Sequence, residues 1–459
     1  MRSWRADSLC LRVTRSLRVN AIGTGGLYGQ AYRADTHWPA VNYIMTRTLD
    51  FENGAFREEA ARSRREPLGG GVTPPMGRGS VQTSAFMADG ISWNGAGAVV
   101  GPLPGLLRAR IHDLWTTSPQ GAIIAAKQYD AKANVRSERG HRYSTLSFKV
   151  PDGFEAEVWV NDDGLVSRID AEVPDSTLGD TLVVTRFDEY QHVGALRFPM
   201  RIRQSWAGGE VFDLNVQEVS VNQPTDIAVP EAIRTFKPSL NVEKIADGVW
   251  FLVGDSHNSV ALEMEDQIVL VESPLSDRYA RRLFEIANRL VPGKMVRTVV
   301  SSHHHFDHTG GLRYAAAQSA TIVVSSLEKA FYERAFSNPN SVVPDALARS
   351  RNKARLTAVD GKRVFPDPVR PVEVHELLGD HSRGWLMVYL PKEKVLVEAD
   401  AFHIWPPGAP PPTEPIGREL SLVNNLERLN LQVERILPLH GRASTVQELY
   451  ERVVKKPPG

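Results

Sequence analysis

Residues 301–311 read SSHHHFDHTGG and hold four of the chain's thirteen histidines. The β-branched run that ends at Val300 predicts a buried strand just before them. Gly310 and Gly311 allow a tight turn just after them, and residues 312–318 are typical of a helix. The cluster is therefore expected at the carboxyl end of a strand, where open α/β sheets collect ligands and catalytic groups.

The spacing inside this stretch predicts a metal site. His303 and His305 can point the same way, because side chains in an extended segment alternate in direction. Asp307 and His308 follow directly and can face a second point nearby. Imidazole with one carboxylate suits zinc, or iron in a similar site. The side chain of His304 should point away from the pair, so we leave it out of the metal shell.

Composition sets wide limits on the class of protein. A chain of 459 residues suits two domains. Its 54 basic and 54 acidic residues give a formal net charge of zero, which argues against a nucleic-acid-binding surface spread over the whole chain. The sequence lacks an apolar run of about eighteen residues, so no membrane-spanning helix is predicted. With Cys10 as the single cysteine, an internal disulfide framework is excluded.

The opening segment, MRSWRADSLCLRVTRSLRV, is basic and lacks both an apolar stretch and a small-residue cleavage site. The sequence as given therefore predicts no secretory signal. A true start further upstream would be compatible with a periplasmic or secreted protein, so the compartment stays open.

The first half of the chain is expected to be rich in β-structure. Residues 1–75 alternate Gly-rich and Arg/Glu-rich pieces and predict an irregular segment. Residues 76–235 predict a β-rich domain, with a helix near 105–115 and an antiparallel meander over 143–221 that is punctuated by DG, LGD and GG turns. This domain is expected to shape or cover the catalytic domain, or to help form a homodimer.

The second half, residues 240–459, alternates strands with helices. Two strand pairs come first, followed by an amphipathic helix over 278–291. Beyond the histidine cluster we expect a helix over 312–318, a strand over 321–324 and a helix over 327–336. This order predicts a layered α/β sandwich, so the whole chain combines an α+β and an α/β part.

The HxHxDH string resembles that of the metallo-β-lactamase-fold hydrolases. Three later positions match the family pattern in the same order: His381 in the turn GDHSRG, Asp400 after the strand KVLVE, and His440 after the strand RILP. The resemblance implies an αββα metallo-β-lactamase sandwich over residues 240–459, preceded by the mainly antiparallel β domain.

The resemblance also implies a ligand set for two ions, expected to be Zn²⁺, with Fe or Mn as alternatives. Carried over position by position, the first ion takes His303, His305 and His381, the second takes Asp307, His308 and His440, and Asp400 bridges both. Asp307 is also expected to be catalytic, as the group that holds the bridging hydroxide in position.

Three departures from the family pattern concern the surroundings of the ligands. Glu272 stands where the second strand pair usually ends in Asp, the turn reads GDHSRG rather than GHTPG, and Ala399 replaces the usual Gly. Asp400 resembles the glyoxalase II, lactonase and phosphodiesterase branches, because one major group of true metallo-β-lactamases has cysteine there.

We therefore expect a hydrolase that uses a dizinc-bound hydroxide on an ester, thioester, lactone or amide bond of a small molecule, with a β-lactam among the candidates. The alternative is a mononuclear iron oxidoreductase of the sulfur dioxygenase type. A third hypothesis is a non-catalytic protein whose β-meander carries a hydrophobic ligand.

A Pro-rich loop over residues 401–417 follows Asp400 directly. Phe402, His403 and Trp405 are expected to form part of the substrate rim beside the metals. A rigid surface loop without a role in binding is the alternative.

Overall fold

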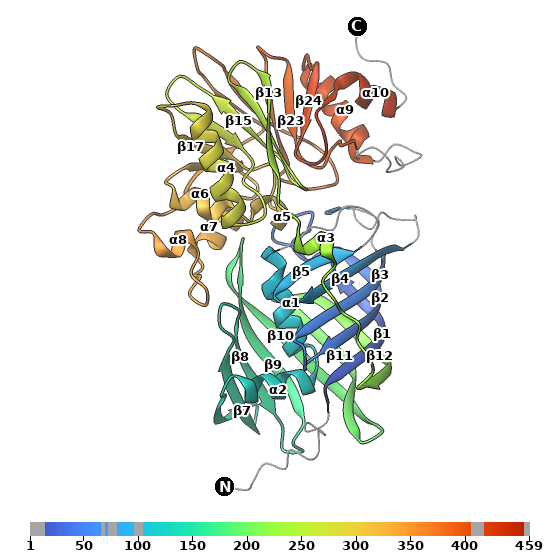
Figure 1. Cartoon of the computed structure of the whole chain (residues 1–459). Coiled ribbons are helices and arrows are strands. Elements are labelled where there is room, and N and C mark those ends of the chain that lie inside the picture. Colours follow the sequence, from blue (N-terminus) through green and yellow to red (C-terminus); the bar gives the residue numbers. More distant parts are fainter. Residues whose placement is uncertain (1–13, 66–68, 72–79, 96–103, 405–416, 454–459) are drawn as a thin grey trace.

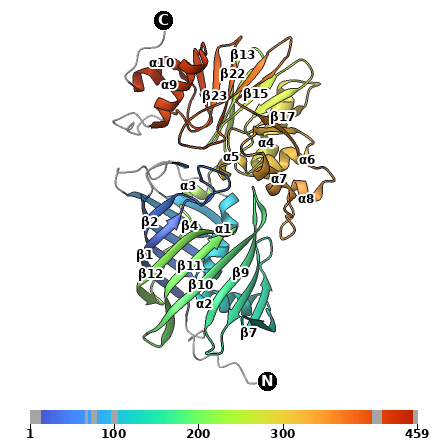
Figure 2. The same ribbon diagram turned by 180° about the vertical axis from the view of Figure 1, so that it is seen from behind.

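The computed structural model describes residues 14–65, 69–71, 80–95, 104–404 and 417–453. These residues form one curved sheet of twelve strands and two further sheets of seven and six strands. The twelve-stranded sheet belongs to the first half of the chain, and the two smaller sheets lie together in the second half (Figures 1 and 2). Among the described helices, none is long and apolar enough to span a membrane.

The N-terminal sheet is antiparallel throughout, in the order β5-β4-β3-β2-β1-β12-β11-β10-β9-β8-β7-β6. Its strands are β1 (Ser16–Gly26), β2 (Ala40–Asp50), β3 (Ala55–Arg64), β4 (Val81–Ala88), β5 (Ile91–Gly95), β6 (Lys132–Glu138), β7 (His141–Lys149), β8 (Glu155–Val160), β9 (Val166–Asp175), β10 (Gly179–Val193), β11 (Leu196–Trp206) and β12 (Gly209–Val221). The expectation that residues 1–75 lack regular structure is wrong for residues 16–64, which supply three of these strands.

The N-terminal sheet wraps around two helices, α1 (Pro104–Thr116) and α2 (Pro119–Gln128). Its strands alternate buried and exposed residues, as β10 does over most of its length, because one face packs on a core while the other meets water. Ser118 caps α2 by accepting a hydrogen bond from the Gly121 N–H. Leu114 and Ala122 of these helices share one core with residues of both halves of the sheet.

The C-terminal half is an αββα sandwich, which confirms the predicted fold class. One sheet has the order β13-β14-β15-β16-β17-β18-β19 and the other β20-β21-β22-β23-β24-β25. Their strands are β13 (Leu240–Ala246), β14 (Val249–Gly254), β15 (Ser259–Glu263), β16 (Ile268–Val271), β17 (Val296–Val300), β18 (Thr321–Ser325), β19 (Arg355–Val359), β20 (Lys362–Phe365), β21 (Val372–Glu376), β22 (Leu386–Leu390), β23 (Val395–Glu398), β24 (Arg435–Pro438) and β25 (Ser444–Thr445).

Helices cover the outer faces of this sandwich. The helices are α3 (Glu231–Arg234), α4 (Asp277–Leu290), α5 (Phe306–Thr309), α6 (Leu312–Ala317), α7 (Lys329–Ser337), α8 (Ala346–Arg349), α9 (Gly417–Leu429) and α10 (Val446–Arg452), of which α3 lies between the two halves of the chain. Helices α4 and α6 pack on the first sheet, while α9 and α10 pack on the second. A core of aliphatic residues from both sheets fills the space between them.

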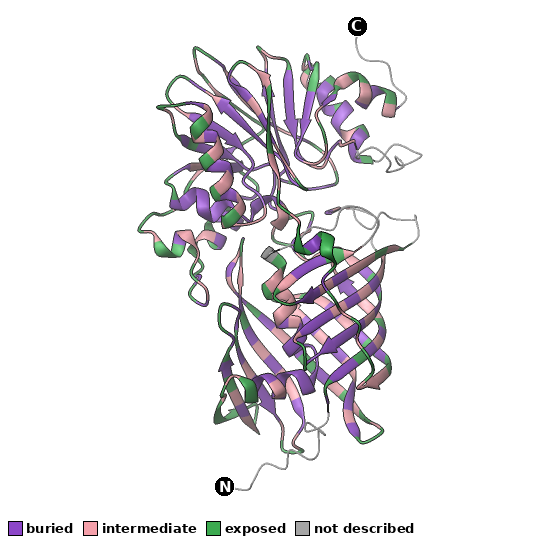
Figure 3. Cartoon of the chain, viewed as in Figure 1, coloured by how far each residue is buried: buried purple, intermediate pink, exposed green. Residues whose placement is uncertain are grey.

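Burial differs between the two halves (Figure 3). Strands β16, β22 and β23 are buried at every position, because both faces of each sheet are covered. Along the N-terminal strands, buried residues alternate with more exposed ones. The sandwich therefore offers polar side chains a protected place at the ends of its strands, and the histidine cluster lies there.

Candidate metal centre

The seven residues predicted to bind metal come from four strand ends and meet in one place. The histidine cluster follows β17, His381 lies between β21 and β22, Asp400 follows β23, and His440 follows β24. Together with His257, which lies between β14 and β15, they form two groups whose potential ligand atoms are within 4.8 Å of one another.

The first group contains His303, His305, His381 and Asp400. His303 Nε2 lies 3.1 Å from His381 Nε2, and Asp400 Oδ2 lies 3.0 Å from His381 Nε2. His305 Nε2 lies 3.0 Å from the Ala31 carbonyl oxygen. Because a carbonyl only accepts, this nitrogen carries the proton, and Nδ1 presents its lone pair. That Nδ1 atom is buried and has no hydrogen-bond partner.

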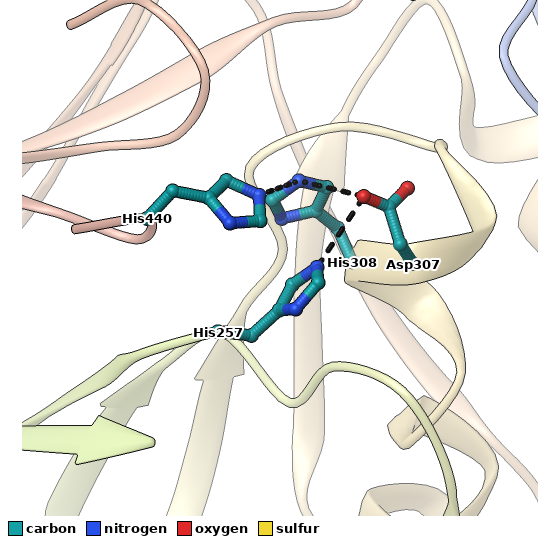
Figure 4. A group of neighbouring side chains, drawn as sticks. All are labelled: His257, Asp307, His308 and His440. Carbon is teal, nitrogen blue, oxygen red and sulfur yellow. Dashed lines mark hydrogen bonds and ion pairs between the residues drawn. The ribbon is translucent and has the colours of Figure 1, made fainter. Parts of the chain in front are cut away.

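The second group contains His257, Asp307, His308 and His440 (Figure 4). His308 Nε2 lies 3.3 Å from His440 Nε2, and His257 Nε2 lies 3.3 Å from Asp307 Oδ2. The Nδ1–H of His440 donates to the Ser256 carbonyl at 2.8 Å, which leaves its Nε2 free to present a lone pair. Sequence reasoning missed His257, although its position between two strands matches that of the other members.

Asp400 lies between the two groups. Its Oδ2 atom is 3.0 Å from Nε2 of both His308 and His381, and its Oδ1 atom is 3.4 Å from His440 Nε2. The backbone at Asp400 has a φ of 62°, in the left-handed region that few residues other than glycine adopt. Such strain is retained where the surrounding structure fixes a functional side chain. This position suits a carboxylate shared by two ions.

The donor atoms fit metal ions better than they fit one another. The Nε2 atoms of His303 and His381 face one another at 3.1 Å in the first group, and those of His308 and His440 face one another at 3.3 Å in the second. Tetrahedral ligands of zinc, at its usual bond length to imidazole nitrogen, lie about 3.3 Å apart. Imidazole and carboxylate donors together suit zinc, iron or manganese.

The electrostatics of the site also suit cations. Burial lowers the pKa of His303, His305 and His381, so these imidazoles are neutral as metal ligands must be. Burial opposes ionisation of Asp400 as well, but the neighbouring histidines, His308 first, hold its pKa well below the usual value. Burial would lower the pKa of His308, but Asp307 and Asp400 outweigh it and raise that pKa, so the second group attracts positive charge.

Two buried glutamates, Glu272 and Glu398, lie next to residues of the two groups. Neither was predicted as a metal ligand or catalytic residue. Glu272 Oε2 accepts a hydrogen bond from Ser302 Oγ at 2.5 Å and lies 3.4 Å from His308 Nδ1. Glu398 Oε2 accepts from the Ala401 N–H at 2.8 Å, beside Asp400. Burial raises the pKa of Glu398 to about 8. Carboxylates that orient metal-binding histidines are common around metal sites.

The remaining predicted positions behave differently from one another. His304 points away from both groups, and its Nδ1 contacts Glu328 Oε1. Phe402 was expected on the substrate rim but is 2% exposed and lies in the same core cluster as Leu422. The His403 ring centroid is 6.3 Å from that of His440, which keeps His403 beside the site. Trp405 lies outside the described residues.

Comparisons with known proteins agree with this geometry. Residues 252–440 match the family model of the Metallo-beta-lactamase superfamily. A curated relative, 2,4-dinitroanisole O-demethylase subunit alpha from Nocardioides sp. (strain JS1661), is 23% identical over 181 residues, which are 39% of this chain and 52% of the relative. The chain thus spans about half the length of the curated relative it matches.

Solved structures of metallo-beta-lactamases are also similar to this chain. DIM-1 metallo-beta-lactamase is 20% identical, with a TM-score of 0.36 over 47% of this chain and 95% of that one. The enzyme from Pontibacter korlensis is 18% identical, with a TM-score of 0.36 over 47% and 96%. The family match over residues 252–440, which coincides with the αββα sandwich and its HxHxDH string, shows that this chain carries a metallo-beta-lactamase superfamily domain.

Proposed function

We propose that this protein is a metal-dependent hydrolase that cleaves an ester, thioester, lactone or amide bond of a small molecule. The observation that carries the proposal is the convergence of eight buried or half-buried His and Asp side chains in two adjacent groups, with Asp400 between them. The second group supports a two-ion centre over the mononuclear iron alternative. We also propose that the boundary between the N-terminal β domain and the C-terminal sandwich lies near residues 235–240.

The first group would hold one divalent ion and the second group the other. When bound, two such ions supply a hydroxide near neutral pH and polarise the oxygen of the bond under attack. Zinc is the expected metal. The His257 imidazole adds a donor at the second position beyond the predicted set, which also suits ions that take more than four ligands, such as iron or manganese.

Asp307 is our candidate for the group that orients the attacking water. Its Oδ1 atom accepts a hydrogen bond from the Gln30 side-chain amide at 2.8 Å, and its Oδ2 atom faces His257 and His308 at 3.3 and 3.6 Å. The Oδ2 atom can therefore orient an attacking water between the groups and accept its proton. His403 borders this space and is our candidate for a residue that contacts substrate.

The relative that acts on 2,4-dinitroanisole adds a methyl ether on a nitrated ring to the substrate classes worth testing. Cleavage of that bond by water would use the same attacking group and would need a good phenolate leaving group. We place it beside the ester, thioester, lactone and amide classes in the screen.

The test is a hydrolysis screen of the purified full chain against β-lactams, lactones, thioesters, phosphodiesters and 2,4-dinitroanisole. The proposal expects turnover of at least one class, loss of that turnover with a chelator, and its return with added zinc, iron or manganese. An enzyme that holds one iron and consumes oxygen with a persulfide, without hydrolysing any of these compounds, would contradict it.

A further inference from the structure

The connection between β1 and β2 leaves the N-terminal sheet and lies against the metal centre. We call residues 28–32 the docking loop. The Gly29 carbonyl accepts a hydrogen bond from the Phe306 N–H at 3.3 Å, and the Tyr32 carbonyl accepts one from the Arg383 N–H at 2.8 Å. These backbone bonds fix the loop beside both the HxHxDH segment and the segment that holds His381.

Side chains hold the same contact in place. The Tyr28 ring packs edge-on against the Phe306 ring, with centroids 5.0 Å apart, and its hydroxyl donates to Asp175 Oδ2 at 2.9 Å. A second bond joins the two halves nearby, between the hydroxyls of Thr177 and Thr309 at 2.9 Å. The docking loop is therefore fastened at its start to the N-terminal sheet and to α5.

Two polar contacts of the docking loop end on residues assigned to the metal centre. The Gln30 amide donates to Asp307 Oδ1 at 2.8 Å, which leaves Oδ2 directed at the second group. The Ala31 carbonyl accepts the proton of His305 Nε2 at 3.0 Å, which fixes the tautomer that presents Nδ1 to the first group. Ala31 is buried, so water does not compete for this proton.

We propose that the N-terminal domain is a working part of the metal centre, because its docking loop positions one ligand of each ion. Gln30 is a positioning residue for Asp307, and the Ala31 carbonyl has the same role for His305. This inference rests on the proposed two-ion centre. Loss of an outer hydrogen-bond partner of a metal ligand costs about 10- to 100-fold in metal affinity, and we expect a loss in that range here.

Gly29 makes the close approach of the loop possible. Its φ of 70° is in the left-handed region, and a Cβ atom there would lie 2.4 Å from the Phe306 ring. Gly54, in the turn between β2 and β3, has a similar φ of 63° and nothing within 4 Å of its Cβ position. Substitution by alanine strains both backbones equally, but only at Gly29 does it push the loop away from α5.

The first experiment removes the donor and keeps the side chain's length. Gln30→Met is compared with Gln82→Met, an exposed position far along the sheet, in the full chain. Binding of Co²⁺ is followed by competition with a chelator and by the visible spectrum of the bound ion. We expect Gln30→Met to weaken binding about 10- to 100-fold and to change the spectrum, and Gln82→Met to do neither.

The second experiment compares Gly29→Ala with Gly54→Ala by the same measurements, with circular dichroism as a check on folding. We expect weaker Co²⁺ binding and a changed spectrum for Gly29→Ala alone. Co²⁺ affinity and spectra equal to wild type in both Gln30→Met and folded Gly29→Ala would overturn the proposed role of the loop, and if Gly29→Ala does not fold, Gln30→Met decides alone. A wild-type chain that binds no Co²⁺ would instead overturn the metal centre itself, and the positioning role with it.

Discussion

Two of the buried polar clusters among the described residues differ in how their charges are balanced. The cluster of the N-terminal sheet contains Tyr43, Arg47, Glu58 and Arg62. Arg47 Nε donates to Glu58 Oε2 at 2.9 Å, and the Tyr43 hydroxyl donates to Glu58 Oε1 at 2.5 Å. Arg62 donates in turn to the Tyr43 hydroxyl at 3.0 Å. The buried pair of Arg47 and Glu58 carries no net charge, and Arg62, whose side chain is 33% exposed, reaches water, so this cluster needs no ligand.

The metal centre leaves some of its buried nitrogens without a partner. Its nitrogens face one another at 3.1 and 3.3 Å, and His305 Nδ1 is buried without a partner. Buried polar atoms of native proteins nearly always have a partner, and each exception asks for an explanation such as an ion. A self-neutralised cluster stabilises the fold, whereas buried nitrogens without a partner indicate a binding site.

Replacing Asp400 by Ala tests the metal centre, and we expect it to change the rate of hydrolysis more than any other variant. The variant loses the carboxylate that contacts His381 of the first group and His308 of the second. Because enzymes accelerate their reactions by at least about 10⁶-fold, and the proposed reaction depends on the ions, hydrolysis should fall by more than about 1,000-fold. The rate on the substrate found in the screen measures this, with exposed Asp163→Ala as the control. A variant that retains the wild-type rate would contradict the assignment.

Glu58→Gln tests the self-neutralised cluster. The change leaves Arg47 buried without its carboxylate, and breaking a buried ion pair in this way costs about 3–5 kcal/mol. Urea unfolding followed by circular dichroism measures the loss, with the exposed pair member Glu155→Gln expected to change stability by less than about 1 kcal/mol. The folded variant should bind metal as wild type does. A Glu58→Gln variant that loses metal but keeps its stability would contradict the distinction between the two clusters.

His257→Ala tests whether His257 is a metal ligand of the second group. Removal of this imidazole should weaken binding of one of two ions by about 10- to 100-fold or more, because a ligand matters at least as much as a ligand's partner. Competition with a chelator measures the change. His375→Ala, a buried histidine that contacts Glu373 outside both groups, is the matched control. Equal affinities in wild type and His257→Ala would remove His257 from the centre.

Acid pH should act on the self-neutralised cluster with a smaller effect. Burial alone would raise the pKa of Glu58, but Arg47 and Arg62 outweigh it and lower the pKa to about 2, from 4.5. A depressed pKa contributes stability that is present above about pH 4.5 and is lost as pH falls toward 2. The free energy of unfolding of Glu58→Gln should therefore fall less steeply than that of wild type across this window. Parallel curves would contradict the pairing.

The C-terminal half could be predicted from its sequence because its signals are local. The histidine cluster, Asp400 and His440 follow strands of mainly buried aliphatic residues, so these strand ends could be predicted directly. The meander over residues 143–221 was predicted from its alternation and turns, but β1, β2 and β3 were missed. In β2 and β3, Arg47 and Glu58 are buried charged residues that interrupt the alternation that identifies strands. The contact between Gln30 and Asp307 spans 277 positions, and no local pattern predicts such a pair.

The most direct test of the account is the metal content of the purified full chain, measured by mass spectrometry of the elements. We expect about two zinc, iron or manganese ions per wild-type chain and fewer than about one in the Asp400→Ala variant, with Glu58→Gln unchanged. A wild-type chain that holds no stoichiometric metal would contradict the claim that its unpaired nitrogens form a metal centre.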